Sequence, residues 1–148
     1  MRFFRRLQSY FTPKTPKLKC FEDRIQYRFI NTYYLEKALT HRSVQNHYEG
    51  NYERLEFLGD AIIDHVVSHW LFKKYVTSDE GTLTKKRAAL VNREFLAMLG
   101  QNIKITEVVQ FDSGVNINDE KVSNNIAADV YESIVGAIYL DGGYEEAT

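Results

Sequence analysis

Residues 51–61 read Asn51-Tyr52-Glu53-Arg54-Leu55-Glu56-Phe57-Leu58-Gly59-Asp60-Ala61. The three acids of this stretch, Glu53, Glu56 and Asp60, stand at offsets 0, 3 and 7, which on an α-helix fall within an arc of about 60°. Apolar residues occupy most of the remaining helix surface: Leu55, Phe57, Leu58, Ile62, Ile63 and Val66. A helix that is apolar on nearly every side is usually buried, and buried carboxylates repel each other and lose hydration unless cations compensate. The stretch therefore predicts a buried helix whose acids favour a metal ion.

A second acidic pair follows in the last third of the chain. Asp129 and Glu132 are three residues apart and share a helix face, with Gly136 one turn further on that face. A glycine at that point lets another element approach closely, and two acidic stripes that met there would repel each other with nothing between them. Oxygen ligands without cysteine or paired histidine favour Mg²⁺ or Mn²⁺, ions that suit phosphoryl chemistry.

The spacing alone leaves a second interpretation open for these acids. Acid pairs three residues apart are common on solvated helices, and Glu53 near a helix start could face water, where the helix dipole favours a negative charge. Asp64 falls on the same arc as Asp60, yet an exposed position would explain it equally well. His65 and His69 are four residues apart and are interpreted as surface or packing residues.

Length and composition indicate one globular domain. A chain of 148 residues with 44% hydrophobic and 26% charged residues is large enough for a real core. Cys20 is the only cysteine, so an internal disulfide framework is excluded and a reducing compartment, the cytoplasm, is expected. No apolar run approaches the ~18 residues of a membrane span, so no membrane association is expected.

The charge is unevenly distributed along the chain. Residues 1–24 carry seven Lys or Arg and two acids, which gives this segment a net charge of +5. Because the net charge of the whole chain is −1, the remaining residues carry a net charge of −6. An acidic body argues against simple phosphate-driven binding of nucleic acid, but bound divalent ions would reverse the local sign. Residues 1–20 superficially suit a transit peptide, and they lack the apolar h-region of a secretory signal, so secretion is not expected. We interpret them as a solvated basic arm.

The hydrophobic pattern predicts a chain of helices. They are expected at residues 20–29, 32–39, 52–75, from Thr82 to about 91, at 95–99 and at 126–140. Gly100 and Asp141-Gly142-Gly143 are expected to end the last two, and Ser123, Asn124 or Asn125 to cap the final one. Residues 101–111 could be helix or strand, and 112–125 are expected to be a loop. Residues 144–148 suggest a further helix cut short, so a longer natural protein is expected to continue there.

Four segments, taken in order and spacing, resemble the ribonuclease III family. The central one is Glu53-Arg54-Leu55-Glu56-Phe57-Leu58-Gly59-Asp60-Ala61; the others are ALTHRS at 38–43, EGTLTK through AALVNR at 80–93, and ADVYES through GAIYLDGG at 128–143. Together they cover roughly residues 21–148. The resemblance implies an all-α endonuclease domain, a helical bundle that forms a symmetric homodimer.

The resemblance also implies roles for individual residues. Glu56, Asp60, Asp129 and Glu132 match the metal-binding carboxylates of the family, with Asp60 and Glu132 as catalytic residues. Glu53 and Glu80 match further acids of the family near the cleft and the dimer interface. Phe57 matches an aromatic knob that enters the partner subunit, and Thr84, Lys85 and Arg87 match residues near the RNA backbone. An ordinary core phenylalanine and a solvated helix face are the alternatives for the last two groups.

The implied activity is Mg²⁺-dependent hydrolysis of double-stranded RNA, with Mn²⁺ as a possible substitute. Products with 5′-phosphate and 3′-hydroxyl ends and short 3′ overhangs are expected, in the processing of ribosomal and messenger RNA precursors. Full-length bacterial enzymes carry a double-stranded-RNA-binding domain that is not expected within residues 1–148, so these residues are expected to retain the chemistry with a lower RNA affinity. The alternatives are a catalytically silent module that binds RNA and a purely structural helical dimer.

Overall fold

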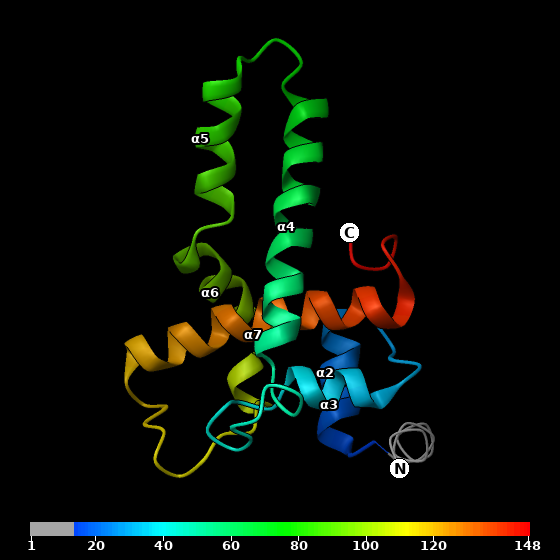
Figure 1. Cartoon of the computed structure of the whole chain (residues 1–148), viewed down its shortest axis with the longest axis vertical. Coiled ribbons are helices and arrows are strands. Elements are labelled where there is room, and N and C mark those ends of the chain that lie inside the picture. Colours follow the sequence, from blue (N-terminus) through cyan, green and yellow to red (C-terminus); the bar gives the residue numbers. More distant parts are fainter. Residues whose placement is uncertain (1–13) are drawn as a thin grey trace.

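The structure, a computed structural model, describes residues 14–148 of the chain. These residues contain six α-helices and one short 3₁₀ helix (Figure 1). They are α2 (Pro16–Ile25), α3 (Thr32–Ala38), α4 (Glu53–Lys74), α5 (Glu80–Leu90), α6 (Arg93–Asn102), η1 (Ile105–Glu107) and α7 (Glu120–Gly142). The expected all-α fold is confirmed. Within the described range, the only strand-like pairing is an isolated bridge between Thr40 and Gln110. Residues 1–13, which include most of the predicted basic arm, lie outside it.

Helix α7 is the centre of the fold. It lies across the body, and α3, α4 and α6 all pack against it (Figure 1). The main core gathers around α7 from segments far apart in the sequence, with fully buried side chains at Phe21, Leu35, Ile105 and Val130. Because one helix serves as the platform for three others, the positions along α7 determine what lies beside each of them.

The crossing of α4 and α7 depends on two glycines. A Cβ atom added at Gly59 would lie 1.8 Å from the carbonyl oxygen of Glu132, and one added at Gly136 would lie 2.3 Å from the carbonyl oxygen of Leu55. Contacts this short are impossible for a side chain, so both positions need glycine for close approach. The inference that Gly136 admits a neighbouring element is therefore confirmed, and the element is α4.

The second half of α4 and the whole of α5 form an antiparallel hairpin that projects from the body (Figure 1). Helix α5 has no buried residue. Asp79 caps it by accepting a hydrogen bond from the Thr82 backbone N–H at 2.8 Å, so α5 begins before Thr82, where the sequence placed its start. Large apolar side chains on α4 and just beyond it are exposed, with Phe72 at 70% and Val76 at 81%.

Two predicted helix starts were wrong because capping residues lie upstream of the apolar pattern. Helix α2 begins at Pro16, not Cys20, with Thr15 as N-cap and proline in the first turn, where its missing N–H costs nothing. Helix α7 begins at Glu120, capped by Asp119, whose carboxylate accepts from two backbone N–H groups. The predicted loop at 112–125 is thus helical over its last six residues.

Two predicted helix features in the second half of the chain were also wrong. Gly100 does not end α6, which runs on to Asn102; instead Gly100 allows contact with α7, since its Cβ would lie 2.4 Å from the Ala127 carbonyl oxygen. Residues 144–148 form turns and no helix. The ambiguous segment 101–111 contains the 3₁₀ turn η1 and the bridge residue Gln110. No helix in residues 14–148 is long and apolar enough to cross a membrane.

Candidate active site

The predicted acids meet where α4 crosses α7. Glu56 and Asp60 come from α4, Asp129 and Glu132 from α7, and the negative charges of the other three all act on Glu132. Glu56 in turn feels the charges of Asp129 and Glu53. The glycine contacts explain the proximity, because the backbones touch at Gly59 and Glu132. The structure thus brings together the four predicted metal-binding carboxylates, with Glu53 beside them.

The environment of the cluster opposes ionisation. Burial, followed by repulsion from Asp60, Glu56 and Asp129, raises the pKa of Glu132 to about 8. Burial and then Asp129 raise the pKa of Glu56 to about 7, against the opposing charge of Arg93. Carboxyls with strongly raised pKa values indicate negative charge that the protein alone does not compensate. A divalent cation between the two helices would supply the missing charge.

These pKa values predict that the protein without divalent ions loses stability as pH rises. Unfolded glutamates ionise near pH 4.5, whereas folded Glu56 and Glu132 hold their protons up to about pH 7 and 8, so the folded state binds more protons in between. The free energy of unfolding in EDTA should fall between about pH 5 and pH 8. Urea titrations of wild type and of a Glu56→Gln, Glu132→Gln double variant would show it: only wild type should decline across the range. Equal slopes for both proteins would contradict the expectation.

Asp129 already has partners on both carboxylate oxygens. The Arg93 guanidinium donates from Nη1 to Oδ1 at 2.6 Å. The Tyr52 hydroxyl donates to Oδ2 at 3.5 Å, a long contact, and burial with the Asp129 charge raises the pKa of Tyr52, which keeps that proton in place. The cation that pairs with Asp129 in this structure is therefore the guanidinium of Arg93, a group of the protein itself.

An open cleft runs beside the cluster. It has a volume of about 780 Å³ and is lined by Glu53, Glu56, Asp129 and Arg93 together with His41 and residues of the segment before α7. Glu53 accepts a hydrogen bond from Asn51 at 3.4 Å and lies 3.8 Å from the guanidinium of Arg42. Asp60 and Glu132 are not part of its lining. The cleft thus opens one side of the acid cluster to solvent.

The donors suit a hard divalent cation, although they are not yet arranged around one. The set consists of carboxylate oxygens only, which matches the ligand preference of Mg²⁺ and Mn²⁺, and the guanidinium at Asp129 acts as a stand-in positive charge. In residues 14–148, no group of three or more acidic, histidine or cysteine side chains converges tightly enough to hold an ion as it stands.

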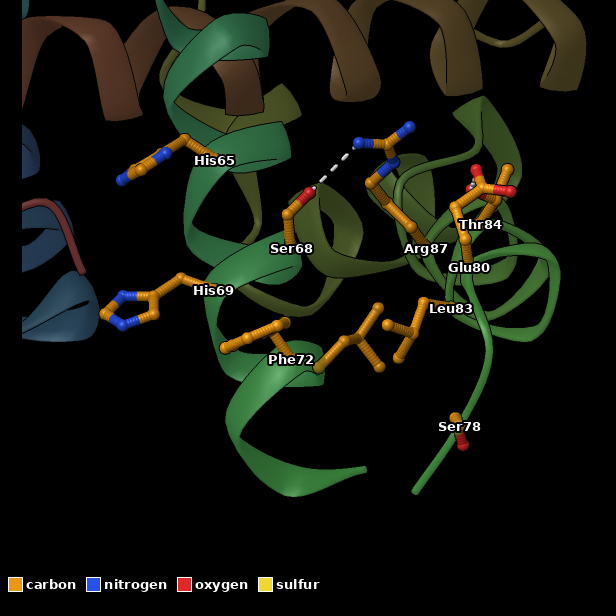
Figure 2. Close-up of a pocket in the computed structure, with 10 residues that line it drawn as sticks. His65, Ser68, His69, Phe72, Ser78, Glu80, Leu83, Thr84 and Arg87 are labelled. Atoms are coloured by element: carbon orange, nitrogen blue, oxygen red, sulfur yellow. Dashed lines mark hydrogen bonds between the residues drawn. The ribbon is translucent and has the colours of Figure 1, made fainter. Parts of the chain in front are cut away.

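Glu80, Thr84, Lys85 and Arg87 lie elsewhere, on the α5 side of the hairpin. Glu80 accepts from Thr84 at 2.9 Å, and Arg87 donates to Ser68 of α4 at 3.1 Å. A pocket of about 810 Å³ lies between the two helices of the hairpin. Figure 2 shows Glu80, Thr84 and Arg87 on the α5 side of it and Ser68 on α4 opposite them. None of the pocket's lining residues belongs to the acid cluster. Within this single chain, Glu80 is therefore not part of the candidate site.

Phe57 points out of the molecule although it sits between the acids in sequence. Its side chain is 81% exposed, in contrast to its neighbour Leu55 at 3%. An ordinary core phenylalanine is thus excluded for this chain. Its ring leaves apolar surface in contact with water.

Sequence reasoning missed two residues at the site, Tyr52 and Arg93. Tyr52 lies within residues 51–61 and Arg93 ends the segment 80–93, but neither pattern predicts a contact for them. Tyr52 precedes α4 and Arg93 opens α6, so no helical spacing relates either of them to Asp129. The only signal available was that buried acids need a nearby cation, which does not identify the residue.

Taken together, these features define an all-helical domain with an acidic site suited to a divalent ion. A family model described as ribonuclease-III-like matches residues 31–148. The chain belongs to the ribonuclease-III-like family.

Several relatives and solved structures support this assignment. Ribonuclease 3 of Bdellovibrio bacteriovorus is 41% identical over 132 residues, covering 87% of this chain and 56% of that protein. Ribonuclease 3 of Brucella melitensis is 41% identical over 126 residues, covering 85% and 51%. The chain therefore spans about half the length of the curated relatives it matches.

The fold comparison agrees. A nuclease domain of ribonuclease III from Campylobacter jejuni, studied for structural flexibility in a region involved in dimer formation, superposes with a TM-score of 0.81 and 38% identity. The match covers 88% of this chain and 90% of that one. A second structure of the same nuclease domain, at 37% identity, also has a TM-score of 0.81.

Proposed function

We propose that this chain is the endonuclease domain of a ribonuclease III, which hydrolyses double-stranded RNA with the help of Mg²⁺. The observation that carries the proposal is the acid cluster at the crossing of α4 and α7, where burial and mutual repulsion raise the pKa of Glu132 to about 8. Holding uncompensated acids together costs stability, and the cost is explained when a divalent ion and a phosphodiester use the site.

In this proposal Glu56, Asp60, Asp129 and Glu132 hold the metal, with Asp60 and Glu132 as the catalytic acids. When bound, divalent ions in such a site activate water and stabilise the departing 3′ oxygen, which gives 5′-phosphate and 3′-hydroxyl ends. The residues of the chain keep the ions beside the 780 Å³ cleft, where the RNA backbone would lie. Mn²⁺, with similar ligand preferences, is expected to substitute.

The proposal includes a symmetric homodimer. Phe57 is 81% exposed at the cluster, and Phe72, about 60° from it around the helix, is exposed further along α4. A second copy would cover this apolar surface, and two-fold symmetry would direct one site to each RNA strand, which explains staggered cuts with short 3′ overhangs. Glu80, Thr84, Lys85 and Arg87 would then act near the interface or along the RNA backbone.

Replacing Phe57 by alanine should weaken self-association. The substitution removes a side chain that makes little contact within its own chain, so folding should be unaffected while the dimer Kd rises about tenfold or more. Sedimentation velocity across a concentration series would measure this. The matched control is Ile30→Ala, which removes an apolar side chain that is 70% exposed between α2 and α3. Identical dimer Kd values for both variants would remove Phe57 from the interface.

The remaining parts of the proposal concern the whole protein. We assign residues 21–148 to the nuclease domain and 1–20 to a basic arm, of which residues 16–20 form the start of α2. In the whole protein, a double-stranded-RNA-binding domain is expected to supply much of the RNA affinity. Processing of ribosomal and messenger RNA precursors in the cytoplasm is the proposed role. The unpaired thiol of Cys20 suits that reducing compartment.

Cleavage of a long RNA duplex at low salt, with and without Mg²⁺, tests the proposal. Wild-type chain should cut the duplex only with Mg²⁺ or Mn²⁺ and should leave single-stranded RNA of the same sequence intact. Binding of the duplex without product across several divalent ions would instead support a catalytically silent RNA-binding module. No effect of divalent ions on either cleavage or melting temperature would support a purely structural dimer.

A further inference from the structure

We propose that Arg93 is a built-in counter-cation of the acid cluster, which occupies Asp129 in the ion-free protein and must leave it before a divalent ion binds there. The inference rests on the proposed metal site and adds a step that controls how that site fills. It follows from the position of Arg93, from the engagement of Asp129, and from the exposure of the guanidinium.

The backbone of Arg93 is fixed by the start of α6, whereas its side chain is largely exposed to solvent. It is the first residue of α6, directly after the N-cap Asn92, whose side chain accepts from the Phe95 backbone N–H at 2.8 Å. This cap fixes the Arg93 Cα near α7. The side chain itself is 57% exposed, so the guanidinium can move into water without a burial penalty.

The Arg93 guanidinium and a metal ion require the same oxygen. Nη1 lies 2.6 Å from Oδ1 of Asp129, whose side chain is only 18% exposed. The other oxygen, Oδ2, faces the Tyr52 hydroxyl at 3.5 Å. An ion bound through Oδ1 would lie close to the guanidinium, and the repulsion between the two cations would oppose its binding until the guanidinium moves away.

The charge of Arg93 reaches the rest of the cluster. It acts on both Glu56 and Glu132, where it opposes the repulsion from neighbouring carboxylates. Arg42, the other arginine lining the cleft, instead lies 3.8 Å from Glu53 at the edge of the cluster. Arg93 thus compensates part of the negative charge of the cluster while no ion is present.

The test compares Mn²⁺ affinity in three proteins without RNA. Wild type, Arg93→Gln and the matched control Arg28→Gln are titrated with Mn²⁺ by calorimetry. Arg28 is also 60% exposed and is paired with acids, Asp23 and Glu22, so its loss changes the net charge equally. We expect Arg93→Gln to bind Mn²⁺ about tenfold more tightly than wild type, about 1.4 kcal/mol, and Arg28→Gln to match wild type. Melting temperatures in EDTA should show Arg93→Gln below wild type, because its acids lose their counter-charge.

The outcomes separate this inference from the proposed function. Equal Mn²⁺ affinity in wild type and Arg93→Gln, or weaker binding in the variant, would overturn the role of Arg93 and leave the metal site standing. Equal gains in both arginine variants would also overturn it, because net charge alone would then explain the effect. Absence of Mn²⁺ binding in all three proteins would overturn both proposals. An Arg93→Lys variant, which keeps the charge but loses the planar fork, should fall between wild type and Arg93→Gln.

Discussion

Glu132→Gln should reduce Mg²⁺-dependent cleavage of duplex RNA by at least about 10³-fold while raising the melting temperature of the ion-free protein. The loss of rate follows from removing an ionisable ligand at the centre of the cluster, since metal-ion catalysis contributes several kcal/mol and each 1.36 kcal/mol is about tenfold. Single-turnover cleavage with excess protein measures the rate, and a thermal melt in EDTA measures stability.

The gain in stability has a separate cause. Burial and three neighbouring carboxylates raise the pKa of Glu132 to about 8, so above pH 5 the folded state is destabilised by a carboxylate that ionises freely when unfolded. A neutral glutamine of the same shape removes that repulsion. An inactive variant that is also more stable is the pattern expected of a residue kept for function against stability.

The control for this prediction is Glu120→Gln, the same substitution at the start of the same helix. Glu120 is exposed in the first turn of α7, so cleavage should stay within about twofold of wild type and stability should change by a few tenths of a kcal/mol from the lost helix-dipole interaction. Substantial residual Mg²⁺-dependent cleavage by Glu132→Gln would sink the assignment of Glu132. A lower melting temperature in EDTA would contradict the electrostatic account of the cluster.

Gly59→Ala should destabilise the fold by about 3 kcal/mol or more. The new Cβ would lie 1.8 Å from the carbonyl oxygen and 2.6 Å from the carbonyl carbon of Glu132. These are backbone atoms of α7 and cannot rotate away, so the two helices must separate. For a domain of this size the melting temperature should fall by about 10 °C, as measured by circular dichroism at the helix band.

Gly81→Ala is the matched control for Gly59→Ala. Gly81 also lies in a helix, but its Cβ would meet only the flexible side chain of Asp79 at 3.3 Å. Alanine has the higher helix propensity, so Gly81→Ala should leave the melting temperature unchanged or raise it. A Gly59→Ala protein as stable as wild type would show that α4 and α7 are not packed backbone to backbone. Because Gly59 contacts Glu132 directly, the variant should also bind Mn²⁺ more weakly than wild type.

The sequence predicted the parts of the fold that local pattern controls. The ranges of α3 and α4 were anticipated within two residues, because their apolar periodicity and turn signals lie within the helices themselves. The starts of α2 and α7 were missed because Thr15 and Asp119 extend each helix beyond its apolar face. Gly100 was interpreted as a helix end because a glycine that ends a helix and one that admits a neighbour look identical in sequence.

Some residues of the candidate site could likewise be predicted from local sequence patterns, and others could not. The spacing of Glu56 and Asp60 on one helix, and of Asp129 and Glu132 on another, together with the family resemblance, was enough to choose the four acids. The sequence allows Phe57 to be either a core residue or an interface residue. Its 81% exposure places the side chain on the surface. Glu80, chosen by resemblance, lies on the hairpin away from the cluster within this chain.

The sequence by itself determined that the chain is helical, that two of its helices carry acidic stripes, and that glycine on one stripe admits a neighbour. These are properties of single helices, set by residue spacing and propensity. Only the tertiary structure decided that Gly59 and Gly136 lie at one crossing, that the stripes face each other there, and that Arg93 is the cation against Asp129. Arg93 and Asp129 are 36 positions apart. Their contact depends on how α6 and α7 pack, and no local pattern encodes that packing.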